Sequence, residues 1–413
     1  MKKLTVLHII ASDISGGAAK GAFYLHESLI EKGVDSILLK QMGGDIPKKN
    51  VYSISNSIYT KILRFIYTYL DRFPLFRYTK RERIAFSPFI YGFDITKNSF
   101  YGEADIIHLH WVNQGMISLS NLKKIKKPIV WTLRDMGVFT GGCHHSFACH
   151  KYENECGACP ILKSNKKHDL SSNIQKRKIR LLPRNIQYVA ISNWLKDCAE
   201  RSRLLKDSKI NVIYNGVDVN SFTLLSKIES RKELGLPNDK KIICLGAINP
   251  KDPYKGFRYA MESLSYLNKD FFFIFFGSLN SNEIPLSPNQ FKNFGYISDT
   301  NYLNRIYSSS DVFLAPSIAE AFGKTLVEAM LSGTPVVCFD NGGPKDIVEH
   351  KKNGYKATPF DPKDLANGII WCLIDQQRHL NLIGNATLAA RLKFDIAEKA
   401  KEYIEVYKNI LNN

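Results

Sequence analysis

The sequence predicts a two-domain α/β protein in which each domain is Rossmann-like and contains a parallel β-sheet. Three observations support this prediction. The chain has 413 residues, too many for one ordinary hydrophobic core. Short apolar runs typical of buried strands alternate with amphipathic helical stretches in both halves of the chain. A polar connection within residues 216–240 separates two series of such runs, so we place the domain boundary there.

The expected strands follow one another in two groups. In the first half they lie at residues 4–11, 35–39, 104–110, 128–133 and 186–191. In the second half they lie at residues 241–246, 271–276, 312–315 and 335–339. The sequence therefore predicts an N-terminal domain of residues 1–215 and a C-terminal domain of residues 216–394. A final amphipathic helix within residues 395–413 is expected to pack back toward the N-terminal domain.

Residues 57–90 interrupt the alternation with a basic and aromatic segment. It carries seven basic residues and two acidic ones, interleaved with tyrosine and phenylalanine. Three interpretations remain open: a solvated basic helix that packs through its aromatic side, contact with an anionic membrane surface, or stacking on single-stranded nucleic acid.

Composition and charge limit the expected partners and location of the protein. A formal net charge of +18 predicts anionic partners, and nucleic acid, phosphorylated ligands and acidic membranes all qualify. No apolar run approaches the ~20 residues of a membrane span. The apolar residues 4–11 contain His8 and lead into Ser12 and Asp13, so we interpret them as a first buried strand and not as a signal peptide. The expected location is the cytoplasm, where the eight cysteines stay reduced.

The stretch from Glu320 to Glu328 reads as a strand, a turn and a helix start. An apolar run ends at Pro316, and helical spacing begins after Gly323. Glu320 then lies at the carboxyl end of a parallel strand, where open α/β sheets bind ligands. The N–H groups of residues 322–325 would point to the same place, which suits an anion that also carries hydroxyl groups. An ordinary strand-to-helix connection with an acidic start is the alternative.

Three further turns follow expected strands. Gly16 and Gly17 precede a helix expected at residues 22–32, and allow either close approach of a ligand or simply a tight turn. Lys255, before Gly256, opens a helix and could neutralise a phosphate, although this dipeptide is common. The loop Asn341-Gly-Gly-Pro either presents backbone to a ligand or caps the next helical turn.

Histidines and cysteines form the remaining candidates. His108 and His110 share one side of a strand, where they could hold a metal, line a cleft or be satisfied by hydrogen bonds. Arg134 ends the following strand, either facing the same cleft or forming an ordinary surface pair. Four cysteines have the spacing C-x5-C-x6-C-x2-C, which suits a structural tetrathiolate zinc site. Redox or unliganded thiols and a catalytic metal are the alternatives for this cluster, which consists of Cys143, Cys149, Cys156 and Cys159.

Taken together, these residues resemble the family 4 retaining glycosyltransferases of the GT-B fold, over nearly the whole chain. The strongest match is the motif P-S-x-x-E-A-F-G-K-T-L-V-E-A-M-L-S-G-T-P-V-V, extended by N-G-G-P-x-D-I-V. The pattern W-T-L-x-D-M followed by F-T-G-G-C-H resembles a subgroup found in bacterial polysaccharide clusters. The resemblance implies parallel sheets that face one another across a cleft.

The resemblance also implies roles for site residues. The catalytic candidates are Glu320, which contacts the donor sugar, Lys255, which binds its diphosphate, and His110. The donor-binding candidates are Gly16, Gly17, Phe322, Gly323, Lys324, Thr325, Glu328 and Arg134, with Glu328 on the nucleotide ribose. Two positions depart from the family pattern: an arginine usual near Ala247 is missing, and Arg134 stands where many relatives have histidine.

The expected function is transfer of a hexose from a nucleotide diphosphate sugar to a glycan or lipid-linked acceptor, with retention of anomeric configuration. No cofactor is expected for catalysis if Lys255 and helix N-termini stabilise the leaving diphosphate. The expected partners are the donor, the acceptor and an anionic membrane surface on the cytoplasmic side, without nucleic acid. The alternatives are a nucleotide-sugar epimerase on the same fold and a non-catalytic sugar or nucleic-acid binder.

Overall fold

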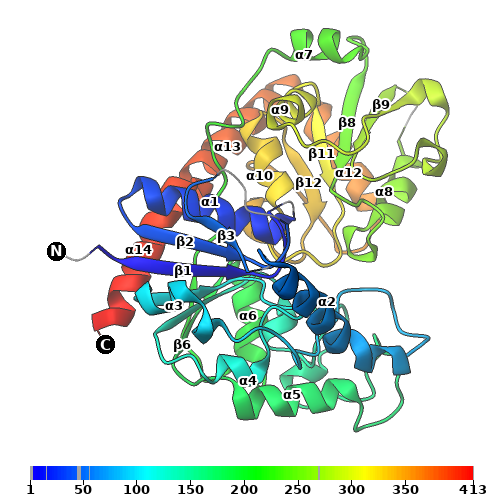
Figure 1. Ribbon diagram of the computed structural model, residues 1–413. Coiled ribbons are helices and arrows are strands. Elements are labelled where there is room, and N and C mark those ends of the chain that lie inside the picture. The colour runs from blue at the N-terminus through cyan, green and yellow to red at the C-terminus, as the bar shows by residue number, and fades with distance from the viewer. Residues whose placement is uncertain (1–2, 15, 44–47, 55, 268–269, 413) are drawn as a thin grey trace. The chain divides into compact units, whose positions relative to one another are not determined.

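The computed structural model describes residues 3–14, 16–43, 48–54, 56–267 and 270–412 (Figure 1). The chain divides into two units. Unit 1 comprises Met1–Gly216 and Ile396–Asn413, and unit 2 comprises Val217–Asp395. Each unit is a parallel β-sheet with helices on both faces, so the predicted α/β class with two Rossmann-like units is confirmed.

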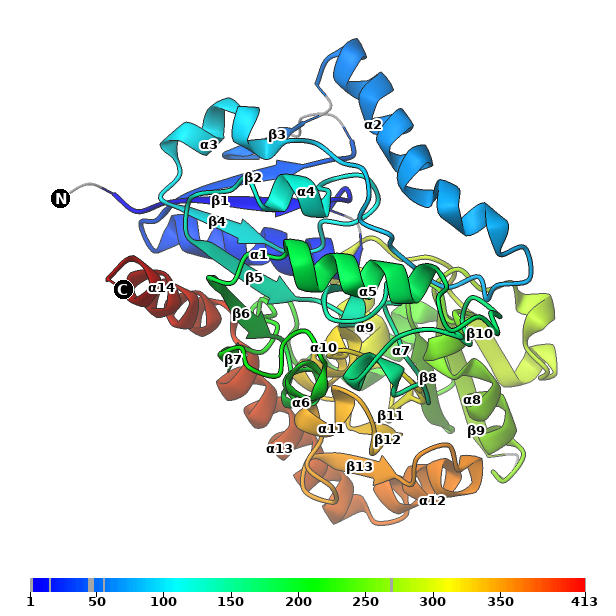
Figure 2. The ribbon, with the colours of Figure 1, turned by 90° about the horizontal axis from the view of Figure 1, so that it is seen from below.

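Unit 1 contains a seven-stranded parallel sheet of order β3-β2-β1-β4-β5-β6-β7. Its strands are β1 (Thr5–Ile10), β2 (Asp35–Lys40), β3 (Val51–Ser53), β4 (Ile106–Leu109), β5 (Ile129–Leu133), β6 (Ile186–Ala190) and β7 (Ile210–Val212). Its helices are α1 (Gly17–Glu31), α2 (Ile58–Arg72), α3 (Ser99–Glu103), α4 (Leu119–Leu122), α5 (Leu170–Leu181), α6 (Asn193–Arg201) and α14 (Ile396–Asn412). Helices α1 and α14 bury their apolar sides on one face of this sheet, and α4 and α5 lie on the other (Figure 2).

Unit 2 contains a six-stranded parallel sheet of order β10-β9-β8-β11-β12-β13. Its strands are β8 (Lys241–Gly246), β9 (Phe271–Phe276), β10 (Phe291–Asn293), β11 (Val312–Ala315), β12 (Val336–Phe339) and β13 (Gly354–Ala357). Its helices are α7 (Lys227–Leu234), α8 (Phe257–Leu264), α9 (Thr300–Ser308), α10 (Lys324–Leu331), α11 (Pro344–Ile347), α12 (Pro362–Leu373) and α13 (Gln376–Phe394). The main core of this unit lies between the sheet and helices α8 and α12.

Helix α2 is the least packed long helix of unit 1 and stands at its edge (Figure 2). Its single buried residue, Asp71, accepts hydrogen bonds from the backbone N–H groups of Ile90 at 2.6 Å and Tyr91 at 3.2 Å. On another side, large apolar residues of α2 and the turn after it are exposed to solvent. We call this set the apolar stripe: Ile58, Tyr59, Ile62, Phe65, Ile66, Tyr69, Phe73 and Phe76.

Among the described helices, none is both long enough and apolar enough to span a bilayer.

Candidate active site

The first part of the candidate site is the turn after β11. As predicted, a strand, a turn and a helix follow one another here, and α10 begins at Lys324. Gly323 precedes this helix with φ of 108°, a left-handed conformation that favours glycine. Gly323 has no side chain, so it provides no side-chain cap at the positive, N-terminal end of the α10 dipole. The Phe322 ring is buried against Phe394, so this residue offers only its backbone to a ligand.

Two ion pairs surround this turn. The Lys255 ammonium bonds the Glu320 carboxylate, and both side chains are partly exposed. Lys324 Nζ lies 3.1 Å from Glu328 Oε1, and the Tyr307 hydroxyl donates to Glu328 Oε2 at 3.2 Å. Burial, followed by the Glu328 charge, raises the pKa of Tyr307 well above its usual value, so this hydroxyl remains a donor. The arrangement places two lysines and two carboxylates beside one helix N-terminus.

The Lys255 turn is fixed against the end of β11. Gly256 has φ of 69°, and an added Cβ would lie 1.9 Å from the carbonyl oxygen of Pro316. The backbone N–H of Ile318 also donates to the carbonyl of Tyr254 at 2.8 Å. Lys255 and Thr325 line one cavity of about 30 Å³ at the carboxyl ends of β8 and β11. The two separate motifs of unit 2 are therefore brought together.

The Asn341-Gly-Gly-Pro loop hydrogen-bonds to the backbone at and before Glu320. The side-chain amide of Asn341 donates to the carbonyl of Ile318 at 2.7 Å, and the N–H of Gly343 donates to the carbonyl of Glu320 at 2.7 Å. Gly343 also precedes α11. These contacts favour the interpretation of this loop as a capping turn, which in addition holds the backbone of Glu320.

In unit 1, Gly16 and Gly17 form the N-terminus of α1. The helix begins at Gly17, five residues earlier than predicted, with Gly16 as its N-cap residue. An added Cβ at either glycine would meet no atom within 4 Å, so their surroundings are open. Ser15, the residue before them, lies outside the described residues.

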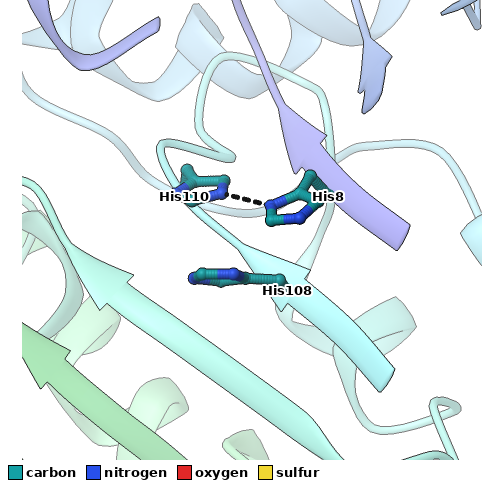
Figure 3. Close-up of side chains that lie close together, drawn as sticks. All are labelled: His8, His108 and His110. Carbon is teal, nitrogen blue, oxygen red and sulfur yellow. Dashed lines mark hydrogen bonds between the residues drawn. The ribbon is translucent and has the colours of Figure 1, made fainter. Parts of the chain in front are cut away.

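Three histidines of unit 1, one from β1 and two from β4 and the residue after Leu109, have their rings close together (Figure 3). His8 Nδ1 lies 3.0 Å from His110 Nε2. The nitrogens of His108 lie 2.7 Å from the Tyr407 hydroxyl and 2.8 Å from the Thr132 hydroxyl. Sequence reasoning found His108 and His110 but missed His8 and Tyr407, which come from distant parts of the chain.

These histidines fit a hydrogen-bond network better than a metal site. Burial lowers the pKa of His8, His108 and His110 well below the usual value, and the Arg134 charge lowers each further. Their ligand atoms lie within 4.8 Å of one another. However, both His108 nitrogens already have hydroxyl partners, and a cation there would be repelled by the neighbouring guanidinium.

Arg134 links this network to α1. It is 8% exposed, donates to the Asn215 side chain, and places Nη2 3.2 Å from His110 Nδ1. An added Cβ at Gly21 would lie 2.6 Å from Arg134 Nη1, so the glycine makes room for the guanidinium. Of the two alternatives for Arg134, an ordinary surface pair is therefore excluded, because the side chain is buried in a network.

A second set of side chains follows Arg134, and of these the sequence had pointed to Asp135, beside Arg134, but not to Trp111 or Ser87. Asp135 Oδ2 accepts from Trp111 Nε1 at 2.8 Å and lies 2.7 Å from His144 Nδ1. The other His144 nitrogen lies 2.8 Å from the Ser87 hydroxyl. Burial alone would raise the pKa of Asp135, but His144, the Gly137 N–H and His145 together outweigh burial and the pKa is lowered. Next to His144, the four clustered cysteines are free thiols that line one cavity.

Comparison with known proteins identifies the family. Residues 15–221, half of the chain, match the model of Glycosyltransferase Family 4, and residues 226–388 match Glycosyl transferases group 1. The chain belongs to glycosyltransferase family 4.

Relatives of this glycosyltransferase are similar over very different lengths. A putative colanic acid biosynthesis glycosyl transferase of Escherichia coli, WcaC, is 21% identical and covers 96% of this chain and 97% of its own. The Campylobacter jejuni N,N'-diacetylbacillosaminyl-diphospho-undecaprenol alpha-1,3-N-acetylgalactosaminyltransferase is 29% identical over 51% of this chain and 57% of its own. The solved structure of Anabaena HepE in complex with UDP and glucose has a TM-score of 0.66 at 18% identity, covering 98% and 99% of the two chains. The fold is thus that of the GT-B glycosyltransferases.

Proposed function

We propose that this glycosyltransferase moves a hexose from a nucleotide diphosphate sugar to a lipid-linked glycan, with retention, in cell-surface polysaccharide synthesis. The observation that carries the proposal is the pair of lysines, Lys255 and Lys324, held with Glu320 and Glu328 at the N-terminus of α10. Lysine charge and a helix N-terminus both favour a diphosphate, and carboxylates suit sugar and ribose hydroxyls.

Each residue receives a role in this proposal. Lys255 exchanges Glu320 for the diphosphate of the donor, which frees Glu320 to orient the sugar. Glu328 bonds the ribose, and the backbone N–H groups of residues 322–325 bind sugar hydroxyls or phosphate. The bond from the anomeric carbon to the diphosphate breaks while the acceptor oxygen attacks the same face, and its proton passes to the departing phosphate oxygen.

In unit 1, we assign Gly16 and Gly17 to ligand binding at the open start of α1. We assign Arg134 to the donor as well, with His110 as the residue that positions its guanidinium. His110 is only 2% exposed, so it has little access to a ligand itself, but it contacts Arg134. This contact supports a positioning role for His110. The function of His110 is then positioning, not proton transfer.

A membrane-bound acceptor is supported by the surface around α2. The apolar stripe of this helix is unusually exposed, with Ile58 at 76% and Phe65 at 73%. At the end of the helix, a pocket of about 350 Å³ is lined by three arginines, Arg72, Arg81 and Arg83. Apolar side chains beside arginines suit the headgroup region of an anionic membrane and a lipid-linked phosphate. Two of the relatives bear names that concern colanic acid and an undecaprenol-linked sugar.

The donor site is tested by calorimetric titration with UDP, GDP, ADP and CMP. We expect one nucleotide to bind at micromolar strength and Glu328→Gln to weaken it by about 1–3 kcal/mol. Glu349→Gln is the matched control, because Glu349 pairs with Lys352 on an exposed surface of the same unit. Equal binding by all three proteins would contradict the assignment of Glu328.

The reaction is tested by product analysis with the donor that binds and a polyprenyl-diphosphate-linked sugar. Transfer with retained configuration supports the proposal. Isomerised donor without transfer would show an epimerase, and binding without turnover a non-catalytic protein.

The membrane surface is tested by sedimentation with phosphatidylcholine vesicles, with and without phosphatidylglycerol. We expect binding only to the anionic vesicles, and its loss in the double variant Ile62→Ser, Phe65→Ser. Ile179→Ser is the control, because Ile179 is an exposed apolar residue of α5 in the same unit. Equal retention of both variants on the vesicles would refute the role of α2.

A further inference from the structure

Four cysteines that are spread over 17 residues converge on one small cavity of unit 1. Cys143, Cys149, Cys156 and Cys159 all line it, and its volume is about 20 Å³. A cavity that holds one water molecule needs about 10–15 Å³ on the same scale, so this cavity has room for one small ion. Three of the cysteines are buried, and Cys149 is partly exposed.

The backbone around the C-x2-C pair is held in place independently of the thiols. The N–H of Cys156 donates to Gln175 Oε1 at 2.8 Å, and the N–H of Cys159 donates to Asp169 Oδ2 at 2.9 Å. Gly157, between them, has φ of 150°, and an added Cβ would lie 2.1 Å from the carbonyl oxygen of Lys167. The turn is therefore fixed in a shape that only glycine allows.

Backbone N–H groups also lie near two of the sulfur atoms. Burial raises the pKa of Cys159 and of Cys156, and the N–H groups of Leu162 and Ile161 oppose this at Cys159, as that of Gly141 does at Cys156. Such donors stabilise thiolates, because they face the charge that a metal-bound sulfur carries.

A buried lysine lies next to the same cavity. Lys178 is 1% exposed, and its ammonium donates to the carbonyls of Gly137 at 2.5 Å and Thr140 at 2.9 Å. Its charge interacts with Cys143 and Cys156. Four thiolates around Zn²⁺ carry a net charge of −2, so a buried ammonium at this position stabilises them.

We propose that these four cysteines bind one Zn²⁺ as a closed structural site. Among the described residues, only the histidine group brings three ligand atoms within 4.8 Å of one another, so the thiols are spaced more widely and must close on the ion. A four-thiolate site has no open position, which makes the metal structural and not catalytic.

The site has a consequence for the candidate active site. Cys143 is followed by His144, which contacts Asp135, and Asp135 follows Arg134. The metal therefore holds the segment that orients Asp135. Loss of the metal is expected to loosen this segment and leave unit 2 intact.

Metal analysis of the purified full-length protein tests the proposal. We expect about one zinc per chain, and at least a fivefold lower zinc content in Cys156→Ser. Cys372→Ala is the control, because Cys372 is a buried cysteine of unit 2. A folded wild-type protein without metal, with four reactive thiols or a disulfide in the cluster, would overturn the proposal.

A second measurement covers the case in which Cys156→Ser does not fold. Wild-type protein produced with Co²⁺ is expected to show thiolate-to-cobalt charge-transfer absorption typical of four sulfur ligands. A spectrum with oxygen or nitrogen ligands alone would exclude the cysteine site. Neither measurement depends on transferase activity, so the zinc proposal and the proposed function can fail separately.

Discussion

Two clusters of polar groups, one in each unit, are stabilised in opposite ways. In unit 2, Lys255 and Glu320 form a charged pair that is partly exposed at the end of a strand. In unit 1, His8, His108 and His110 form an uncharged network that is fully buried. Partly exposed ion pairs contribute little to stability and can exchange partners, whereas buried networks are costly to disturb. We therefore expect the Lys255–Glu320 pair to rearrange around a ligand and the histidine network to stay rigid.

The largest expected effect is on catalysis in unit 2. Lys255→Ala should lower kcat/KM about 1,000-fold, because the charge on the leaving diphosphate loses about 4 kcal/mol of stabilisation. The free energy of unfolding should change by less than about 1 kcal/mol, since the pair with Glu320 is partly exposed. Initial rates and urea unfolding measure the two effects. Lys352→Ala is the control on an exposed pair, and equal rates for both variants would break the comparison.

The next effect is the acid sensitivity of unit 1. The folded pKa of His8, His108 and His110 is lowered, so below pH 6.5 the unfolded state binds more protons than the folded state. The stability they contribute is present above pH 6.5 and lost as the pH falls, by about 1 kcal/mol per histidine between pH 7 and 5.5.

Tryptophan fluorescence can isolate this effect. Trp371 is the single tryptophan in unit 2, so Trp371→Phe leaves only reporters in unit 1. Urea unfolding of that variant at pH 7.5, 6.5 and 5.5 should show the loss. An unchanged midpoint across this range would mean that the histidines are not held neutral.

The same contrast explains which parts of the fold could be predicted from sequence. Strands in the middle of each sheet are continuous apolar runs and were found, for example β8 and β9. The four strands that were missed lie at the sheet edges: β3, β7, β10 and β13. Each has only three or four residues. An edge strand is less completely buried than a central strand, so no continuous apolar run marks it in the sequence.

The candidate site divides in the same way. The turn from Glu320 to Glu328 is one continuous strand, turn and helix, so its geometry follows from local sequence. The contact of His108 with Tyr407 joins residues 299 positions apart. No local pattern predicts such a contact, because it exists only after α14 packs on the first sheet.

A single-residue test of the network should have a moderate effect. His108→Phe leaves the Tyr407 and Thr132 hydroxyls without their imidazole partner and should lower the free energy of unfolding by about 2 kcal/mol. Nucleotide affinity should stay unchanged. His150→Phe is the control, because His150 is exposed in the same unit. A His108→Phe protein that lost affinity without losing stability would place this histidine in the ligand site.

The smallest expected effect comes from Asp71 of unit 1, whose contribution to stability depends on pH with the opposite sign to that of the three histidines. Burial raises the pKa of Asp71 to about 6, against the opposing N–H groups of Ile90 and Tyr91. The folded state therefore binds more protons than the unfolded state between about pH 4 and 6, so this group stabilises less as the pH rises through that range. Asp71→Asn should remove the slope and gain about 1 kcal/mol at pH 7, measured by urea unfolding.

Asp94→Asn is the contrasting control. Burial alone would raise the pKa of Asp94, but hydrogen bonds from Lys124 and Thr96 lower it overall, so the wild-type carboxylate stabilises the folded protein at neutral pH. A loss of stability at pH 7 in both variants would mean that the folded protein stabilises the ionised Asp71 carboxylate, which contradicts a raised pKa for this group.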